Sequence, residues 1–175
     1  MADGTLKVGT ITNSAGSGNI TIGSGVTLLS STPSFFAYLS SSQSITDDTI
    51  TKVQCGTELY DTDNCYDNTT NYRFTPTAAG KYYFTLAVTS NAGAANLQES
   101  NIYLYKNGVA VSRALDNFDS NFANAVVTTA NIIQEANGTT DYFEMYTSIN
   151  DTSGNPSVYG ESKIATYFGA YRIGA

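Results

Sequence analysis

Several residue types on which enzymes commonly depend are missing or scarce in this chain of 175 residues. It has no histidine and no tryptophan, two cysteines, three prolines, and eight lysines and arginines against fifteen aspartates and glutamates. Without histidine the chain cannot form a Ser-His-Asp or Cys-His pair, which excludes the commonest way of activating a nucleophile. Two cysteines without histidine also argue against a zinc site.

Positive charge is scarce as well, and the formal net charge is −7. Duplex binding depends on lysine and arginine neutralising phosphates, so we expect no nucleic acid partner. Attachment to anionic lipid is disfavoured for the same reason. No run approaches the roughly 20 apolar residues of a membrane-spanning helix, and no basic start with an apolar core marks a signal peptide. We therefore expect no membrane insertion and a route to the outside by lysis or on an assembled particle.

Aromatic and β-branched residues dominate what is present, with 13 tyrosines and 8 phenylalanines. Residues 81–89 alternate regularly, which places Tyr82, Phe84, Leu86 and Val88 on one face of a strand. Successive strand side chains point to opposite faces, so we expect this row in a core. No period of 3.6 residues is sustained beyond two turns. The sequence therefore predicts an all-β protein.

Strand candidates follow one another at short, regular intervals, which is typical of a sandwich or barrel. Asn107-Gly108 between two apolar runs predicts a tight two-residue hairpin, because both residues tolerate positive φ. The expected strands are 35–39, 50–55, 58–60, 72–75, 81–89, 102–105, 109–112, 125–134, 142–149 and 164–173.

Residues 1–32 differ from the rest of the chain. Short β-type runs there flank a Gly/Ser-rich loop, and Pro33 marks a boundary. Because an isolated hairpin is marginal in water, we expect this segment to pair with another copy, with the main domain or with a partner. The predicted organisation is a β-rich attachment segment, 1–32, followed by a β-domain, 33–175.

Four blocks of sequence, in order, resemble the globular head of the complement first component's q subunit. They are Phe36-Ala37-Tyr38-Leu39, the stretch 66–84 with Tyr66-Asp67, Phe74-Thr75-Pro76 and Gly80-Lys81-Tyr82-Tyr83-Phe84, then residues 102–109, and finally residues 167–173. That head is one of the tumour-necrosis-factor-like jelly rolls, so the resemblance implies a jelly-roll β-sandwich and a homotrimer. Where the family has a short Gly-Asp turn, this chain has the longer loop 137–141, which places an inherited apical calcium site in doubt.

A second resemblance is to virion-associated proteins of marine bacteriophages. It rests on residues 57–67 running into 72–76, and on Gly9-Thr10-Ile11-Thr12 with residues 18–23. It implies a virion protein made in the host cytoplasm, attached to other virion proteins through residues 1–32. The head would face outward as a tail fibre or knob, or as a capsid decoration protein. Host contact would then fall on the polar loops 91–100, 113–123 and 150–160.

Closely spaced acids make Asp61, Asp63 and Asp67 weak candidates for calcium ligands, since hard oxygen donors suit this ion. The stretch fails as an EF-hand loop, because Tyr66 and Tyr72 occupy its glycine and closing glutamate positions. A solvated acidic turn is the alternative. No other cofactor is expected.

Many tyrosines are expected on strand faces that point away from the core, where a broad ring with a polar tip suits contact with a sugar or a protein. Such a surface usually marks an interface, and in a trimer sister copies would cover it. The outward tyrosines considered are Tyr60, Tyr103, Tyr105, Tyr142, Tyr146, Tyr159 and Tyr167. The trimer-interface candidates are Tyr83, Tyr103, Tyr105 and Tyr167.

No motif selects a catalytic pair among the carboxylates, although a glycosidase needs only two. We therefore expect a protein that is not an enzyme. Two alternatives remain: a carbohydrate-binding jelly roll working as a monomer or dimer, and a depolymerase cutting host polysaccharide. The carboxylates considered are Asp116, Asp119, Glu135, Asp141 and Glu144.

The two cysteines, Cys55 and Cys65, allow two interpretations. A disulfide between adjacent strands would contribute about 2–3 kcal/mol by closing a short loop. Reduced thiols are expected of a chain made in cytoplasm.

Overall fold

The computed structural model describes Ser24, residues 32–118 and residues 123–174, and these residues form thirteen strands. No helix in this part of the chain is long and apolar enough to cross a bilayer. In chain order the strands are β1 (Ser34–Tyr38), β2 (Ser41–Ser44), β3 (Thr51–Lys52), β4 (Thr57–Asp61), β5 (Tyr66–Asp67), β6 (Arg73–Phe74), β7 (Gly80–Asn91), β8 (Leu97–Lys106), β9 (Val109–Asn117), β10 (Ala125–Ala136), β11 (Phe143–Asp151), β12 (Ser157–Glu161) and β13 (Tyr167–Gly174).

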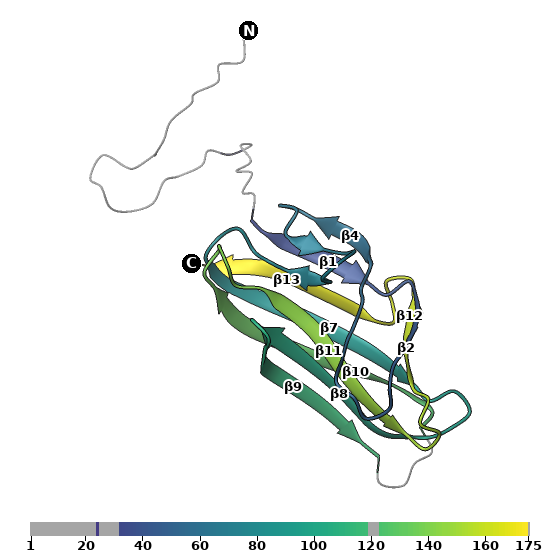
Figure 1. Ribbon diagram of the computed structural model, residues 1–175. Coiled ribbons are helices and arrows are strands. Elements are labelled where there is room, and N and C mark those ends of the chain that lie inside the picture. Colours follow the sequence, from purple (N-terminus) through teal and green to yellow (C-terminus); the bar gives the residue numbers. More distant parts are fainter. Residues whose placement is uncertain (1–23, 25–31, 119–122, 175) are drawn as a thin grey trace, which may run out of the picture. The chain divides into compact units, whose positions relative to one another are not determined.

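The strands form two antiparallel sheets that pack as a sandwich (Figure 1). Sheet 1 has the order β2-β12-β7-β13-β1-β4, with β10 pairing with β7. Sheet 2 has the order β5-β6-β11-β8-β9, with β3 pairing with β11. The last strand, β13, lies beside the first, β1, so the two ends of the domain meet in one sheet. The prediction of an all-β sandwich is confirmed.

The alternation in β7 places its side chains as predicted. Tyr82, Phe84, Leu86 and Val88 are each fully buried between the sheets. Tyr83, the neighbour of Phe84, points to the other side of sheet 1 and remains partly exposed. The period of two thus fixes which face of this strand builds the core.

Stacked aromatic rings fill the centre of the sandwich. Phe35 lies 4.5 Å from Tyr66, 4.6 Å from Phe74 and 4.9 Å from Phe168, measured between ring centroids. The group joins the two sheets, since Tyr66 and Phe74 belong to sheet 2, and Phe84 of β7 extends it with its ring 6.2 Å from Phe74. Stacked and edge-to-face pairs of this kind add about 0.5–1.5 kcal/mol each beyond burial of area. Aromatic side chains therefore make up the centre of the core.

The predicted Asn-Gly hairpin joins β8 and β9. Asn107 has φ 52° and Gly108 φ 79°, both in the left-handed region that this turn requires. Asp141 accepts a hydrogen bond from the Asn107 side chain at 2.7 Å. It also forms an ion pair with Lys106 at 3.0 Å. The carboxylate of the 137–141 loop therefore holds the neighbouring hairpin in place.

Each of the ten expected strand positions overlaps an observed strand, although the bounds differ. The last expected strand begins at Tyr167 rather than at residue 164, and the one expected over 50–55 is confined to Thr51–Lys52. Three strands, β2, β5 and β12, were not expected. Apart from Ser24 and Thr32, the predicted attachment segment 1–32 lies outside the described residues.

Candidate functional site: two outward faces of the sandwich

The four tyrosines predicted at a subunit interface are divided between the two sheets. Tyr83 in β7 and Tyr167 in β13 point outward from sheet 1. Tyr103 and Tyr105, both in β8, point outward from sheet 2. Since packed sheets turn their outer faces in opposite directions, one flat contact cannot cover all four rings.

The outward surface of sheet 1 carries a cluster of aromatic side chains, and Lys81 of β7 lies opposite Glu135 of β10 in the next outward row beyond Tyr83 and Ile133. The Phe36 ring lies 5.2 Å from Tyr167 and 6.5 Å from Tyr60, and Tyr83 lies 5.3 Å from Tyr171. The cross-strand rows from β10 to β4 that hold these rings contain no Asp, Glu, Lys or Arg. We call this surface the sheet-1 face; its residues are Phe36, Tyr60, Tyr83, Ile133, Tyr167 and Tyr171.

One cross-strand row on the outward surface of sheet 2 has two tyrosines in its middle and a cation at each end. The register aligns Arg113 of β9, Tyr103 of β8, Tyr146 of β11 and Lys52 of β3 in one row. The Arg113 guanidinium carbon lies 5.7 Å from the Tyr103 ring centre, and Lys52 Nζ lies 5.6 Å from that of Tyr146. Tyr105 lies beside this row, with its ring 6.2 Å from Tyr103 and 4.4 Å from Tyr146.

The cations of this surface are paired with carboxylates. Lys52 donates to Glu144 Oε1 at 2.6 Å, and Arg113 Nη2 donates to Glu99 at 3.2 Å. Burial acts to lower the pKa of Lys52, but the hydrogen bond and charge of Glu144 outweigh it and the pKa is raised. Arg113 Nε also donates to the buried Asn101 at 2.7 Å. We call this surface the sheet-2 face; its residues are Lys52, Asn101, Tyr103, Tyr105, Arg113, Glu144, Tyr146 and Ser148.

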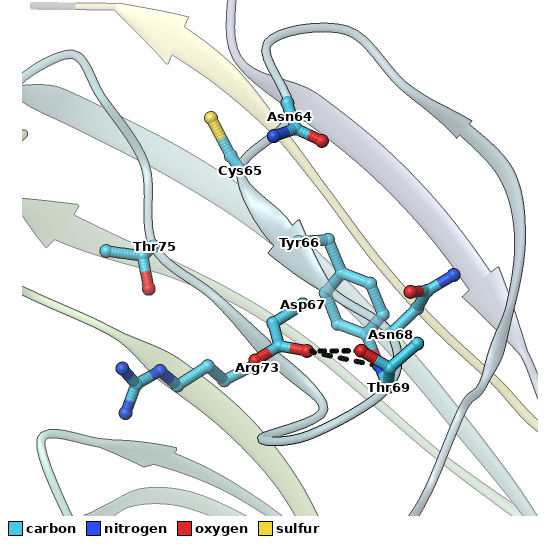
Figure 2. A pocket seen from close by; sticks show the side chains of 8 residues that line it. All are labelled: Asn64, Cys65, Tyr66, Asp67, Asn68, Thr69, Arg73 and Thr75. Atoms are coloured by element: carbon cyan, nitrogen blue, oxygen red, sulfur yellow. Dashed lines mark hydrogen bonds between the residues drawn. The ribbon is translucent and has the colours of Figure 1, made fainter.

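A polar hollow of about 510 Å³ lies at the β5–β6 edge of sheet 2 (Figure 2). Asp67 is in its wall and accepts hydrogen bonds from the backbone N–H groups of Thr70 at 2.9 Å, Thr69 at 3.1 Å and Asn71 at 3.1 Å. The Thr70 N–H, followed by those of Thr69 and Asn71, holds the pKa of Asp67 well below its usual range. Its side chain therefore closes the turn after β5. The lining residues are Asn64, Cys65, Tyr66, Asp67, Asn68, Thr69, Arg73 and Thr75.

The other two calcium candidates lie just before this turn. Asp61 Oδ2 accepts the N–H of Tyr66 at 2.8 Å, and Asp63 lies in the turn between β4 and β5. Asp61 and Asp67 thus bind different backbone groups. Over residues 32–118 and 123–174, no group of three or more His, Cys, Asp or Glu side chains is arranged to bind a metal ion.

The carboxylates considered for catalysis are placed on separate elements and bonded to different partners. Asp116 of β9 accepts from Thr128 at 2.5 Å, whereas Glu144 of β11 pairs with Lys52. Asp141 binds the β8–β9 hairpin, and Glu135 is exposed on β10. Asp119 lies outside the described residues. The geometry therefore shows no selected pair among the four carboxylates that are described.

Both cysteines are free thiols and both are buried. Burial raises the pKa of Cys55 well above its usual range. Cys65 Sγ lies 3.7 Å from the hydroxyl of Thr77. Of the two interpretations, the structure shows the reduced one.

Loops predicted to contact a host meet at one end of the sandwich. The Asn96 N–H donates to the Thr152 side chain at 3.2 Å, and the Thr152 N–H donates to the Asn96 carbonyl at 3.0 Å. The Leu97 N–H donates to the carbonyl of Ala123 at 2.8 Å. Parts of the segments 91–100, 113–123 and 150–160 therefore share one surface. The prediction that these segments are loops holds only in part, because residues 97–100 belong to β8, 113–117 to β9, 150–151 to β11 and 157–160 to β12.

No protein-family model and no curated protein matches the chain. Its fold is similar to that of the globular domain of zebrafish complement 1qA protein, at 14% identity and a TM-score of 0.56, covering 81% of this chain and 97% of that chain. It is similar to murine APRIL, at 10% identity, a TM-score of 0.56, and coverage of 81% and 99%. It is also similar to Eiger TNF from S. frugiperda, at 8% identity, a TM-score of 0.55, and coverage of 81% and 91%.

These likenesses establish the fold class. The protein is a jelly-roll β-sandwich of the complement-q and tumour-necrosis-factor-like type, as the resemblance in its sequence implies. Sequence reasoning found the tyrosines but missed Arg113 and Lys52 as their neighbours on the sheet-2 face. Only the strand register brings these residues together, and no local pattern encodes it.

Proposed function

We propose that this chain is a non-enzymatic structural protein of a bacteriophage particle and that it assembles as a homotrimer through the sheet-1 face. Residues 1–32 attach it to other virion proteins. The jelly roll is exposed on the particle, either binding the host surface as a tail fibre or knob or decorating the capsid. The observation that carries self-association is the cluster of aromatic side chains on the outward surface of sheet 1.

An aromatic surface of this kind on a single subunit favours contact with another protein. Tyr171 is 48% exposed and Ile133 53% exposed, and the two share one cross-strand row with Tyr83. Among the described strands β10 pairs only with β7, so its other edge is open beside this surface. In a closed threefold assembly each copy contacts the next through two different patches. The β10 edge of one copy against the sheet-1 face of the next would cover both features.

The particle location is supported by the resemblance of residues 57–67 with 72–76, and of residues 9–12 with 18–23, to marine bacteriophage virion proteins. The gathering of the loops at 92–96 and 152–156 supports an exposed binding end, because loops vary without disturbing a core. Many copies on one particle would turn weak single contacts into useful avidity.

A non-catalytic role is supported by the absence of histidine from the sequence and by the bonding of the described carboxylates. Glu144 is held by Lys52, and Asp141 by Lys106 and Asn107. A depolymerase would instead release reducing sugar from host polysaccharide, and Glu144→Gln would abolish that release if Glu144 were catalytic.

The mass of the full chain in solution tests the trimer. We expect light scattering at micromolar concentration to give three times the chain mass of 18.6 kDa. Tyr171→Glu places a charge in the sheet-1 face and should give a folded monomer, while Tyr105→Ser on the opposite face should remain trimeric. A wild-type monomer with an intact β-sheet circular dichroism spectrum would refute self-association.

Particle membership needs a separate test. Electron microscopy of purified particles labelled with an antibody to this chain should place the label on the tail or on the head. Particles free of label, alongside labelled free protein from the same lysate, would refute the virion role.

A further inference from the structure

We infer that the sheet-2 face binds an uncharged saccharide. The inference deepens the proposed function. It rests on that function only for the source of the saccharide, which is a host surface. The binding site itself is argued from the rings, charges and hydrogen bonds of sheet 2.

Three tyrosine rings cluster on this face, and we call the cluster the platform; the Tyr105 ring is tilted by 41° from that of Tyr146 and by 69° from that of Tyr103. Tyr105 is 4.4 Å from Tyr146 and 6.2 Å from Tyr103, and all three are partly exposed on adjacent strands. A tyrosine presents an apolar ring with a polar tip, which matches the apolar faces and hydroxyl edges of a pyranose. The Tyr103 and Tyr105 hydroxyls make no hydrogen bond to another described residue. They are therefore available to a ligand.

The platform is held rigid by its surroundings. Asn101 is buried beside it, accepts from Arg113 and donates to Ser148 at 3.1 Å. Arg113 lies over the Tyr103 ring and Lys52 over the Tyr146 ring, at opposite ends of the row, so Tyr105 is the ring over which the described residues place no cation. A surface whose side chains are already fixed loses less entropy when it orders a ligand.

The charges on the face favour a neutral ligand. Its two cations are each ion-paired with a carboxylate, so their formal charges cancel. Unpaired arginines would be expected for binding phosphate or carboxylate groups. The pairs are Lys52 with Glu144 and Arg113 with Glu99. Arg73, at the β5–β6 edge of the sheet, lies instead over the Tyr142 ring, with its guanidinium carbon 4.7 Å from the ring centre.

The two faces of the sandwich differ in their polar neighbours, as expected if one face binds protein and the other binds a saccharide. The rings of the sheet-1 face have uncharged partners in their own cross-strand rows, with Lys81 and Glu135 in the next row, and such a surface suits contact between proteins. The sheet-2 face offers rings among fixed hydrogen-bonding groups, and saccharide sites combine apolar surface with a few placed polar groups in this way. The Asp67 hollow opens at the β5–β6 edge of the same sheet and extends the polar surface.

Affinity electrophoresis of the full chain in native gels provides the test, with dextran, mannan, xyloglucan and laminarin as the probes. We expect retardation by at least one of them and none by dextran sulfate beyond that by dextran. Tyr105→Ala and Tyr103→Ala should weaken retardation about tenfold or more, because aromatic anchors dominate such contacts. Tyr159→Ala, on β12, is the matched control and should bind as the wild type does.

Light scattering on the same variants separates this inference from the proposed trimer. Loss of saccharide binding with an unchanged mass supports the inference. A lower mass for Tyr105→Ala would show that a sister copy covers the sheet-2 face, and that result would overturn it. The inference would also be overturned if none of the four polymers retarded the protein, or if Tyr105→Ala were retarded as much as the wild type. Either result would count whatever the mass of the wild type.

Discussion

Single aromatic residues connect the two sheets, and Phe84 is the clearest case. Its ring is fully buried, 4.5 Å from Phe143 of sheet 2 and 6.2 Å from Phe168 of its own sheet. We expect Phe84→Ala to lower the free energy of unfolding by about 3–5 kcal/mol, because a cavity remains where the ring packed. Urea denaturation followed by circular dichroism measures it. Val109→Ala, at a position 65% exposed, should change it by less than about 0.5 kcal/mol.

Asp67 makes a pH-dependent contribution at the same scale. Backbone N–H groups lower its pKa in the folded state, so its stabilising effect is complete above the unfolded pKa of about 3.9 and is lost as the pH falls through the folded pKa. We expect wild type to be more stable than Asp67→Asn at pH 6, with the difference shrinking between about pH 4 and pH 2. Urea denaturation at stepped pH measures it. A difference that does not vary with pH would contradict this account.

At the scale of the strands, a chain of buried hydroxyls joins the two sheets. Ser90 of β7 lies 2.7 Å from Ser100 of β8, which lies 2.8 Å from Thr128 of β10, and Thr128 donates to Asp116 of β9. Each buried hydroxyl depends on the next for its hydrogen bond.

Breaking this chain should be costly. Thr128→Val keeps the shape of the side chain but leaves Ser100 and Asp116 each short of a partner, so we expect a loss of about 1–3 kcal/mol. Thr129→Val, at the neighbouring exposed position of β10, is the control and should be close to neutral. Thermal unfolding of the two variants at one pH provides the comparison, and equal melting temperatures would refute a structural role for the chain.

Strands with strong alternation were predictable from the sequence, and the polar strands were not. β7 shows its core face directly through Tyr82, Phe84 and Leu86. The strand β2 is mostly exposed serine, and β5 has two residues, so neither shows a hydrophobic period. Such strands form because a neighbouring strand offers hydrogen bonds, which is a tertiary effect.

At the scale of the whole molecule, the limit of sequence reasoning is the assignment of strands to sheets. Alternation showed that Tyr83 and Tyr105 point away from the core, and the structure agrees. It did not show that β7 and β8, although consecutive, belong to different sheets. Tyrosines that are alike in sequence therefore lie on opposite faces, one among uncharged rings and one among paired charges.

The division of the chain at Pro33 leads to a test on the whole molecule. The buried core of the described residues starts at Phe35, and Thr32 contributes only a carbonyl that accepts from Thr62 at 2.9 Å. A variant beginning at Ser31 should therefore keep its trimer mass and melt within about 2 °C of the full chain, since small changes in stability shift the melting temperature little. It should no longer co-sediment with particles that lack this protein, whereas the full chain should. A large fall in melting temperature would mean that residues 1–30 belong to the folded domain, and attachment by the shortened chain would mean that the jelly roll itself holds the particle.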